Sequence, residues 1–284
     1  MYKPIEHPMT TTLLTGLPRS GTTLACALLN EFLDTLALAE PLALQRDGDR
    51  ERALSDIESF IRTTRETAVS AGVAISKHDV DGAIPENFVE APSVTQGRRL
   101  RKLLVRHGQI RIEKPLSEVF SLVIKHPAEF STLADLILPR YPLVALVRHP
   151  LAVLAAWQTV DMPVNRGRMP MAEAYSPGLA AMLDGIGDRV QRQVALIGWL
   201  LGVYSQFPPS QVIRYEDMIA DPERQLRRFT PHSGAPVRPI ERYDIASRYT
   251  GVDLRHLAHE LLAICSIAER FYPDFESSLA PYLT

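Results

Sequence analysis

The chain has 284 residues, with 31 Lys and Arg against 33 Asp and Glu, which gives a formal net charge of −2 at pH 7. This balance excludes the strongly basic surface that nucleic-acid-binding proteins carry. A chain this long can bury a substantial core, and α/β folds of this length commonly form one domain. We therefore expect a single domain over residues 1–284.

Neither a metal site nor a membrane segment is expected from the sequence. Cys26 and Cys265 lie far apart and lack neighbours at metal-ligand spacing, so both are predicted to be buried thiols. No apolar run reaches the length of a membrane span, and the first residues lack the apolar core of a signal peptide. We expect a cytoplasmic protein.

The first predicted elements are a strand, a turn and a helix. Thr11 to Thr15 are predicted to form a short, β-rich buried strand. Gly16 to Gly21 form a tight Gly/Pro loop, and Thr22 to Phe32 are predicted to form an amphipathic helix. In this arrangement the backbone N–H groups of the loop and the positive end of the helix dipole converge on one point. The segment is therefore predicted to bind an anion.

The spacing of this loop is that of a P-loop with one substitution. The nucleoside-triphosphatase form has Lys after its second Gly, followed by a hydroxyl residue that holds Mg²⁺. Here Thr22 follows Gly21, and the cation of the loop is Arg19. A nucleotide with one phosphate and a transferable anionic group fits this loop better than a metal-bridged triphosphate.

The next segments suggest alternating strands and helices. Residues 34–40 are predicted to form a strand that stops at Pro41, so that Glu40 lies at a carboxyl end, where open α/β sheets bind ligands. Residues 47–72 have helical spacing, and residues 73–98 are loop-like. Further strands are expected at 109–115, 120–125 and 141–147, and further helices at 129–138 and 151–158.

The remainder of the chain is predicted to be mostly helical. Residues 159–188 combine helix and loop, and residues 231–248 are irregular. Helices are expected at 190–204, 222–229 and 254–271, and a strand at 210–217. Strand–helix–strand units of this length imply a mainly parallel sheet flanked by helices, so the fold class is α/β.

The sequence from Gly16 to Thr23, Gly-Leu-Pro-Arg-Ser-Gly-Thr-Thr, resembles the 5′-phosphosulfate loop of sulfotransferases that use 3′-phosphoadenosine 5′-phosphosulfate (PAPS). The resemblance implies that the loop backbone, Ser20, Thr22 and Thr23 hold the 5′-phosphate. It also implies that Arg19 approaches the oxygen bridging phosphate and sulfuryl group. The loop residues expected to bind PAPS are Gly16, Pro18, Arg19, Ser20, Gly21, Thr22 and Thr23.

A second anion site is expected at Arg148, which follows a predicted strand and precedes a helix. A guanidinium there can bind a phosphate bidentately, with support from the helix dipole. In the sulfotransferases that the chain resembles, such an Arg binds the 3′-phosphate together with a Ser eight residues later. That position is Ala156 here, so another donor, such as Arg238, Arg242 or Arg248, would have to replace the hydroxyl.

Tyr215-Glu-Asp-Met218 resembles the sulfotransferase segment whose Tyr lies near the adenine. This similarity adds Tyr215 to the expected nucleotide-binding residues. The alternative is structural: the Tyr packs in the core, and the two acids cap the next helix.

Three residues are candidates for the general base, each at the carboxyl end of a predicted strand. His126 follows Lys125 in an arrangement similar to the Lys-x-His of cytosolic sulfotransferases, and Lys125 could neutralise sulfuryl oxygens. Glu40 occupies the place where tyrosylprotein and some carbohydrate sulfotransferases carry a catalytic Glu. Glu113 is the third candidate. The sequence does not choose among them.

The resemblance implies a P-loop-like transferase that moves a sulfuryl group from PAPS to a hydroxyl or amine, without a metal. The acceptor would be a small molecule or a carbohydrate, with its pocket formed by segments 73–98 and 159–188. Two alternatives remain: a P-loop nucleotide kinase or NTPase, which Thr22 disfavours, and a non-catalytic nucleotide-binding protein, which Ala156 keeps open.

Overall fold

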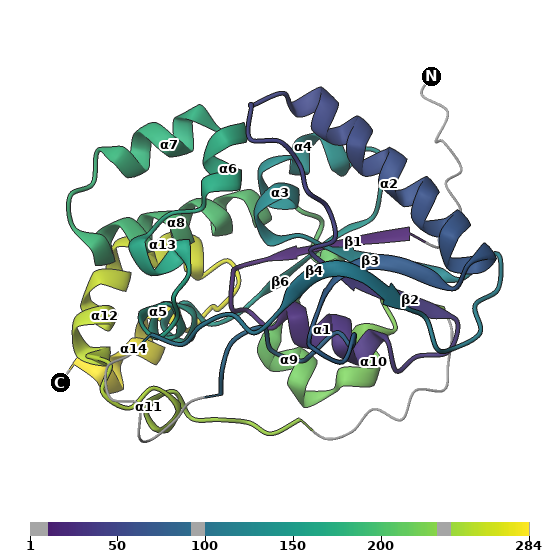
Figure 1. The fold of residues 1–284 in the computed structure, drawn as a ribbon. Coiled ribbons are helices and arrows are strands. Elements are labelled where there is room, and N and C mark those ends of the chain that lie inside the picture. Colours follow the sequence, from purple (N-terminus) through teal and green to yellow (C-terminus); the bar gives the residue numbers. More distant parts are fainter. Residues whose placement is uncertain (1–10, 92–99, 232–239, 284) are drawn as a thin grey trace.

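The central feature of the computed structural model, which describes residues 11–91, 100–231 and 240–283, is a parallel five-stranded sheet (Figure 1). The strand order is β2-β5-β1-β6-β7, and every neighbouring pair is parallel. The strands are β1 (Thr11–Gly16), β2 (Thr35–Ala39), β5 (Ser121–Lys125), β6 (Leu143–Val147) and β7 (Val212–Arg214). The predicted fold class, α/β with a mainly parallel sheet flanked by helices, is confirmed.

Both faces of the sheet are covered, as buried parallel strands require. Leu13 of β1 belongs to the larger apolar cluster and the next residue, Leu14, to the smaller one, because successive side chains point to opposite faces. Figure 1 shows α2, α3 and α4 over one face and α1, α9 and α10 over the other. The sequence therefore buries near-continuous apolar strands between two helical layers.

The helices before residue 215 largely follow the sequence pattern. Asp49 caps α2 by accepting a hydrogen bond of 3.0 Å from the N–H of Arg52, and Leu54, Ile57 and Ile61 face the core. The predicted helix at 129–138 is divided at Leu133 into two short ones. These helices are α1 (Thr22–Leu29), α2 (Arg50–Ser70), α3 (Pro127–Thr132), α4 (Ala134–Ile137), α5 (Pro150–Gln158), α6 (Pro170–Tyr175), α7 (Pro177–Asp184) and α8 (Arg189–Tyr204), with 3₁₀ turns at Pro163–Arg166 and Pro209–Gln211.

A two-stranded antiparallel sheet corrects the prediction of a loop from residue 73. β3 (Val73–His78) pairs with β4 (Arg106–Arg111), which begins three residues before the strand expected at 109–115. The Ser76 hydroxyl accepts a hydrogen bond of 3.0 Å from the N–H of Ala39 at the end of β2. β3 thus lies beside the edge of the main sheet, in a tertiary contact with β2 that was not predicted from the sequence.

The C-terminal third differs most from the sequence-based expectation. The predicted strand 210–217 is shorter because α9 begins at Tyr215, where Glu216 and Asp217 favour a helix N-terminus. The predicted helix 254–271 is interrupted by a 3₁₀ turn, in which Ile264 packs closely over Gly198 of α8. The observed helices are α9 (Tyr215–Ala220), α10 (Pro222–Leu226), α11 (Ile245–Arg248), α12 (Leu254–Leu261), α13 (Cys265–Ala268) and α14 (Phe275–Leu283), with the 3₁₀ turn at Leu262–Ile264.

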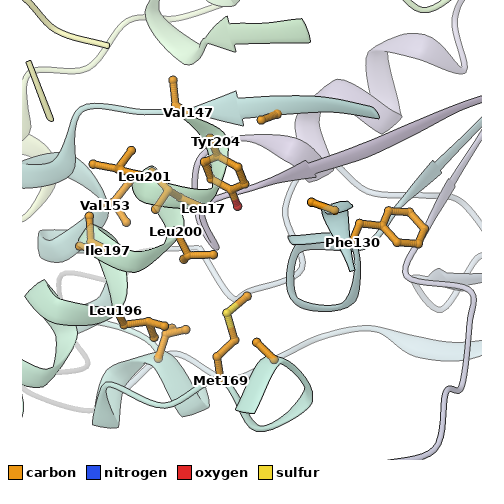
Figure 2. Close-up of a cluster of buried hydrophobic side chains, with 14 of the residues drawn as sticks. Leu17, Phe130, Val147, Val153, Met169, Leu196, Ile197, Leu200, Leu201 and Tyr204 are labelled. Carbon is orange, nitrogen blue, oxygen red and sulfur yellow. The ribbon is translucent and has the colours of Figure 1, made fainter. Parts of the chain in front are cut away.

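The core beneath α8 fixes the position of β1. Figure 2 shows Tyr204 of α8 among buried side chains that include Leu17 and Phe130. The Tyr204 hydroxyl lies 2.7 Å from that of Ser131 on α3, which in turn lies 2.7 Å from the Thr15 hydroxyl. This buried chain of hydroxyls ties the carboxyl end of β1 to two helices.

Two further expectations from the sequence concern the burial of the cysteines and the presence of membrane-spanning helices. Cys26 is buried, and burial raises the pKa of its thiol to about 12, whereas Cys265 is only partly buried, contrary to the prediction. Across residues 11–91, 100–231 and 240–283, no helix has the length and apolar composition needed to cross a bilayer. The cytoplasmic location stays a prediction.

Candidate active site

The carboxyl ends of all five parallel strands meet at one edge of the sheet. The loop 16–21 follows β1, Glu40 follows β2, Lys125 ends β5, and Arg148 and Tyr215 follow β6 and β7. Together these positions border one cavity of about 580 Å³. The sheet order places Glu40 and Lys125 on one side of the loop and Arg148 and Tyr215 on the other.

The loop after β1 holds a conformation suited to binding an anion. Gly21 has φ 100°, and a Cβ there would come within 2.5 Å of the Tyr215 ring, so only glycine fits. The buried Ser20 hydroxyl has no hydrogen-bond partner among the described residues. Thr22 and Thr23 begin α1, where backbone N–H groups lack intrahelical partners. These unsatisfied donors fit a phosphate group.

The loop is anchored from α5. Trp157 is fully buried, and its indole N–H donates a hydrogen bond of 2.8 Å to the Pro18 carbonyl. This bond fixes the turn just before Arg19, which itself adopts φ 73°. A left-handed conformation is uncommon for a non-glycine residue and persists only where neighbouring groups support it. The hydrogen bond from Trp157 gives this support, so it helps to set the direction of the Arg19 side chain.

Arg19 lies among other arginines. Its Nη1 donates to Asn87 Oδ1 at 3.0 Å, whereas its buried Nε has no partner among the described residues. Burial, followed by repulsion from Arg101, Arg148 and Arg248, lowers the pKa of Arg19 to about 10. The group remains a cation at neutral pH. Its surroundings therefore suit an anion, and no carboxylate among the described residues is hydrogen-bonded to Arg19.

Arg148 lies between this loop and Tyr215. Its Nη1 donates to the Arg19 carbonyl at 3.3 Å, and its guanidinium carbon lies 4.6 Å from the centroid of the Tyr215 ring. Ala156 is buried in the core, away from the cavity lining. Of the replacement donors expected for it, Arg248 lines the cavity, Arg242 does not, and Arg238 lies outside the described residues.

The Tyr215 segment does not follow the structural alternative, because the tyrosine is not packed in the core and Asp221, rather than the two acids, caps the next helix. The Tyr215 ring lines the cavity. Glu216 accepts hydrogen bonds from the His149 N–H at 3.1 Å and the Tyr272 hydroxyl at 2.7 Å. Asp217 pairs with Arg214 at 2.8 Å. The two acids thus join α9 to its neighbours, and the tyrosine alone faces the site.

Glu40 lies between two lysines. One carboxylate oxygen contacts Lys125 Nζ and the other contacts Lys77 Nζ, and the lysines flank the Phe88 ring, with Nζ at 4.9 and 5.8 Å from its centroid. Burial alone would raise the pKa of Glu40, but attraction to the two lysines and hydrogen bonds from them hold it well below its ordinary 4.5. Glu40 is therefore ionised at neutral pH.

Lys77 was missed by the sequence analysis, which treated its segment as a loop. The strand-like pattern Val73-Ala-Ile-Ser-Lys-His78 was the available signal. Only the contact of β3 with β2 brings its ammonium group to Glu40.

His126 is placed behind the cavity wall. Its Nε2 accepts a hydrogen bond of 2.9 Å from the Leu42 N–H, and its Nδ1 lies 3.1 Å from Glu129 Oε2. The side chain is 2% exposed and does not line the cavity, whereas Glu129 does. His126 therefore contacts the site through Glu129, a residue that the sequence analysis did not single out.

Glu113 lies at the opposite edge of the sheet. Its neighbour Lys114 donates to the carbonyls of Asn30 at 2.7 Å and Phe32 at 2.9 Å, just beyond the C-terminal end of α1. The N-terminal end of the same helix adjoins the cavity. The structure does not bring Glu113 to the site.

His149 beside Arg148 provides a pH test of the packing at this edge. The imidazole lies 5.3 Å from the Tyr272 ring and 5.2 Å from the Phe275 ring, between centroids. Burial lowers its pKa from 6.5 to about 4, although Glu216 opposes the shift. Between pH 6.5 and about pH 4, the imidazole gains a proton in the unfolded chain but not in the folded protein. The contribution of His149 to the free energy of unfolding should therefore be fully present above pH 6.5 and decrease as the pH falls towards 4.

We expect His149→Phe to lose this part of the pH dependence. Urea unfolding at pH 7.5 and pH 5 measures it, with His256→Phe, at an exposed position of α12, as the matched control. An unchanged difference between the two pH values in His149→Phe would contradict the assignment.

No three His, Cys, Asp or Glu side chains in the described ranges are grouped so that they could hold a metal ion. The hydrogen-bond donors that line the site include cationic side chains and the N–H groups at the start of α1, on a parallel α/β sheet. The family model described as "Sulfotransferase family" matches residues 12–239. The chain belongs to the sulfotransferase family.

Two solved structures are similar to the chain at low sequence identity. The "Sulfotransferase Domain from the Curacin Biosynthetic Pathway" shares 16% identity, with 96% of each chain covered and a TM-score of 0.38. Sulfotransferase STF1 from Mycobacterium tuberculosis shares 11% identity over 89% of this chain and 76% of that one, with a TM-score of 0.34. No curated protein matches the sequence.

Proposed function

We propose that the protein transfers a sulfuryl group from PAPS to a hydroxyl or amine acceptor and releases adenosine 3′,5′-bisphosphate. The observation that carries this proposal is the loop after β1. Among the described residues, the buried Ser20 hydroxyl and the Arg19 Nε have no hydrogen-bond partner. Thr22 stands where a nucleoside triphosphatase has lysine. A singly phosphorylated donor with a sulfuryl group matches these groups.

In this proposal the donor extends across the edge of the sheet. The N–H groups at Gly21, Thr22 and Thr23 bind the 5′-phosphate, and Tyr215 contacts the base. Arg148 binds the 3′-phosphate. Arg248, which lines the same part of the cavity, supplies the donor that Ala156 cannot.

The reaction is a single in-line displacement at sulfur. The acceptor oxygen forms a bond to sulfur as the bond from sulfur to the 5′-phosphate oxygen breaks, and the leaving phosphate keeps that electron pair. Arg19 stabilises the charge on the leaving oxygen, and the proton of the acceptor moves to the Glu40 carboxylate. Lys77 and Lys125 neutralise the sulfuryl oxygens. As they turn from Glu40 to these oxygens, the carboxylate becomes a stronger base.

Calorimetry with two nucleotides tests the proposal. Adenosine 3′,5′-bisphosphate should bind without magnesium, whereas ATP with Mg²⁺ should bind at least about tenfold more weakly, because no lysine follows Gly21. Saturation by ATP with Mg²⁺ and no heat with the bisphosphate would favour a kinase or NTPase instead. Binding of the bisphosphate without sulfation of any acceptor would favour a non-catalytic nucleotide-binding protein.

Arg148→Ala should weaken the bisphosphate selectively. We expect its Kd to rise about 10- to 100-fold, while the Kd of adenosine 5′-phosphosulfate, which lacks the 3′-phosphate, stays within about threefold. Arg214→Ala is the matched control, since Arg214 lies at the same edge but pairs with Asp217 and does not line the cavity. Equal losses for both nucleotides would remove Arg148 from the 3′-phosphate site.

A further inference from the structure

One side of the cavity has an apolar wall made mostly of methionine and proline. It is formed by the start of α3, the 3₁₀ turn at Pro163–Arg166 and the start of α6. The apolar residues that line it include Pro127, Ala128, Met162, Val164, Met169 and Met171. Methionine side chains are flexible and polarisable, so they adapt to apolar ligands of irregular shape.

The α3 and α6 parts of this methionine wall lie on the Glu40 side of the cavity, whereas the 3₁₀ turn packs on α5 and α8. The loop that follows Glu40 contacts α6 twice: Arg46 Nε lies 3.1 Å from Met171 Sδ, and the Tyr175 hydroxyl donates to the Gln45 carbonyl. Arg148 and Tyr215, by contrast, follow strands on the other side of β1. A molecule against the α3 and α6 parts of the wall would therefore approach Glu40 from the side opposite Arg148 and Tyr215.

Two of the charged residues beside the wall, Arg168 and Glu129, have partners within the protein. Arg46, whose contact at the wall is the sulfur of Met171, is a third charged residue there. Arg168 pairs with Glu173 at 2.8 Å and also with Asp184. The Glu129 carboxylate lies 3.1 Å from His126. Arg168 and Glu129 are already engaged, so they offer little to a highly hydroxylated ligand, whose polar groups would lose their bonds to water without replacement.

From this wall we infer that the acceptor is an apolar alcohol with an aliphatic chain, rather than a carbohydrate. The inference rests on the proposed function and names its acceptor class. The chain packs on the methionine wall, and the hydroxyl reaches Glu40 and the two lysines. The wall is part of the same cavity as the anion-binding loop, which places both substrates in one continuous site.

The experiment compares 1-octanol with methyl β-glucoside as acceptors for the full-length protein with PAPS. Saturation-transfer NMR on protein saturated with adenosine 3′,5′-bisphosphate measures binding, and mass spectrometry measures the sulfated product. We expect saturable binding and sulfation of 1-octanol and neither for the glucoside. Met162→Gln and Met171→Gln should each raise the KM or Kd for 1-octanol about tenfold, with the Kd of the bisphosphate unchanged.

Met182→Gln is the matched control, because Met182 is 38% exposed on α7 and does not line the cavity. It should leave 1-octanol binding unchanged. Glucoside binding without 1-octanol binding, or equal effects of all three substitutions, would overturn the inference. Failure of the bisphosphate to bind would refute the proposed function instead, so the two failures are distinguishable.

Discussion

Arg19→Ala should lower kcat by about 10²- to 10³-fold while changing the KM of the acceptor little, because Arg19 acts on charge that develops on the leaving phosphate. The substitution adds no backbone strain that arginine lacks, since both residues have a Cβ at φ 73°. Its measured effect would therefore report the lost guanidinium. Steady-state kinetics with PAPS gives kcat and KM, and calorimetry gives the affinity for the bisphosphate.

Arg19→Lys is the informative companion variant. Lysine keeps a positive charge, but it lacks the planar guanidinium that could donate hydrogen bonds to Asn87 and to PAPS at the same time. We expect the kcat of Arg19→Lys to lie between those of Arg19→Ala and the parent. Its difference from the parent would measure what the planar shape of the guanidinium contributes. Should Arg19→Ala turn over at the parent rate, Arg19 would have no part in the reaction.

The meeting of the β1 loop and Arg148 at one edge of the sheet could be predicted from the sequence, because the signals for these two segments are local. The loop from Gly16 to Thr23 and the Arg148 segment each combine a strand end, a turn and a helix start within a few residues. Parallel strands then bring those ends to one edge. Glu40 and Lys125 follow from the same rule, because each ends a neighbouring strand.

What could not be predicted depends on contacts between distant segments. Lys77 reaches Glu40 only because Ser76 bonds to the end of β2 across 37 residues of sequence. His126 was a candidate base at a strand end, yet its Nε2 accepts a hydrogen bond from the N–H of Leu42. The choice among candidate bases was a question of burial and of partners, which single-sequence patterns do not encode.

Glu40→Gln should lower kcat by about 10²- to 10⁴-fold, whereas His126→Gln should change kcat by no more than about threefold. Glu40 lines the cavity between two lysines, and His126 lies behind Glu129. His126→Gln should instead lower the free energy of unfolding by about 1–3 kcal/mol, because the partly buried Leu42 N–H and the buried Glu129 lose their partner. Kinetics and urea unfolding of both variants measure the two effects, and the reverse ranking of kcat would make His126 the base.

The pH dependence of kcat/KM distinguishes Glu40 from His126 as the general base without a mutation. Because lysines hold the pKa of Glu40 well below 4.5, its carboxylate is ionised in the free enzyme, and kcat/KM should not fall between pH 7.5 and pH 5.5. An imidazole base ordinarily gains its proton near pH 6.5, which would make kcat/KM fall across that interval.

The ion pairs of Glu40 should also contribute stability that is present above about pH 4.5 and lost as the pH falls below it. That acid-side loss should be smaller in Glu40→Gln, and an equal loss in the variant would show that the lysine pairs do not stabilise the fold.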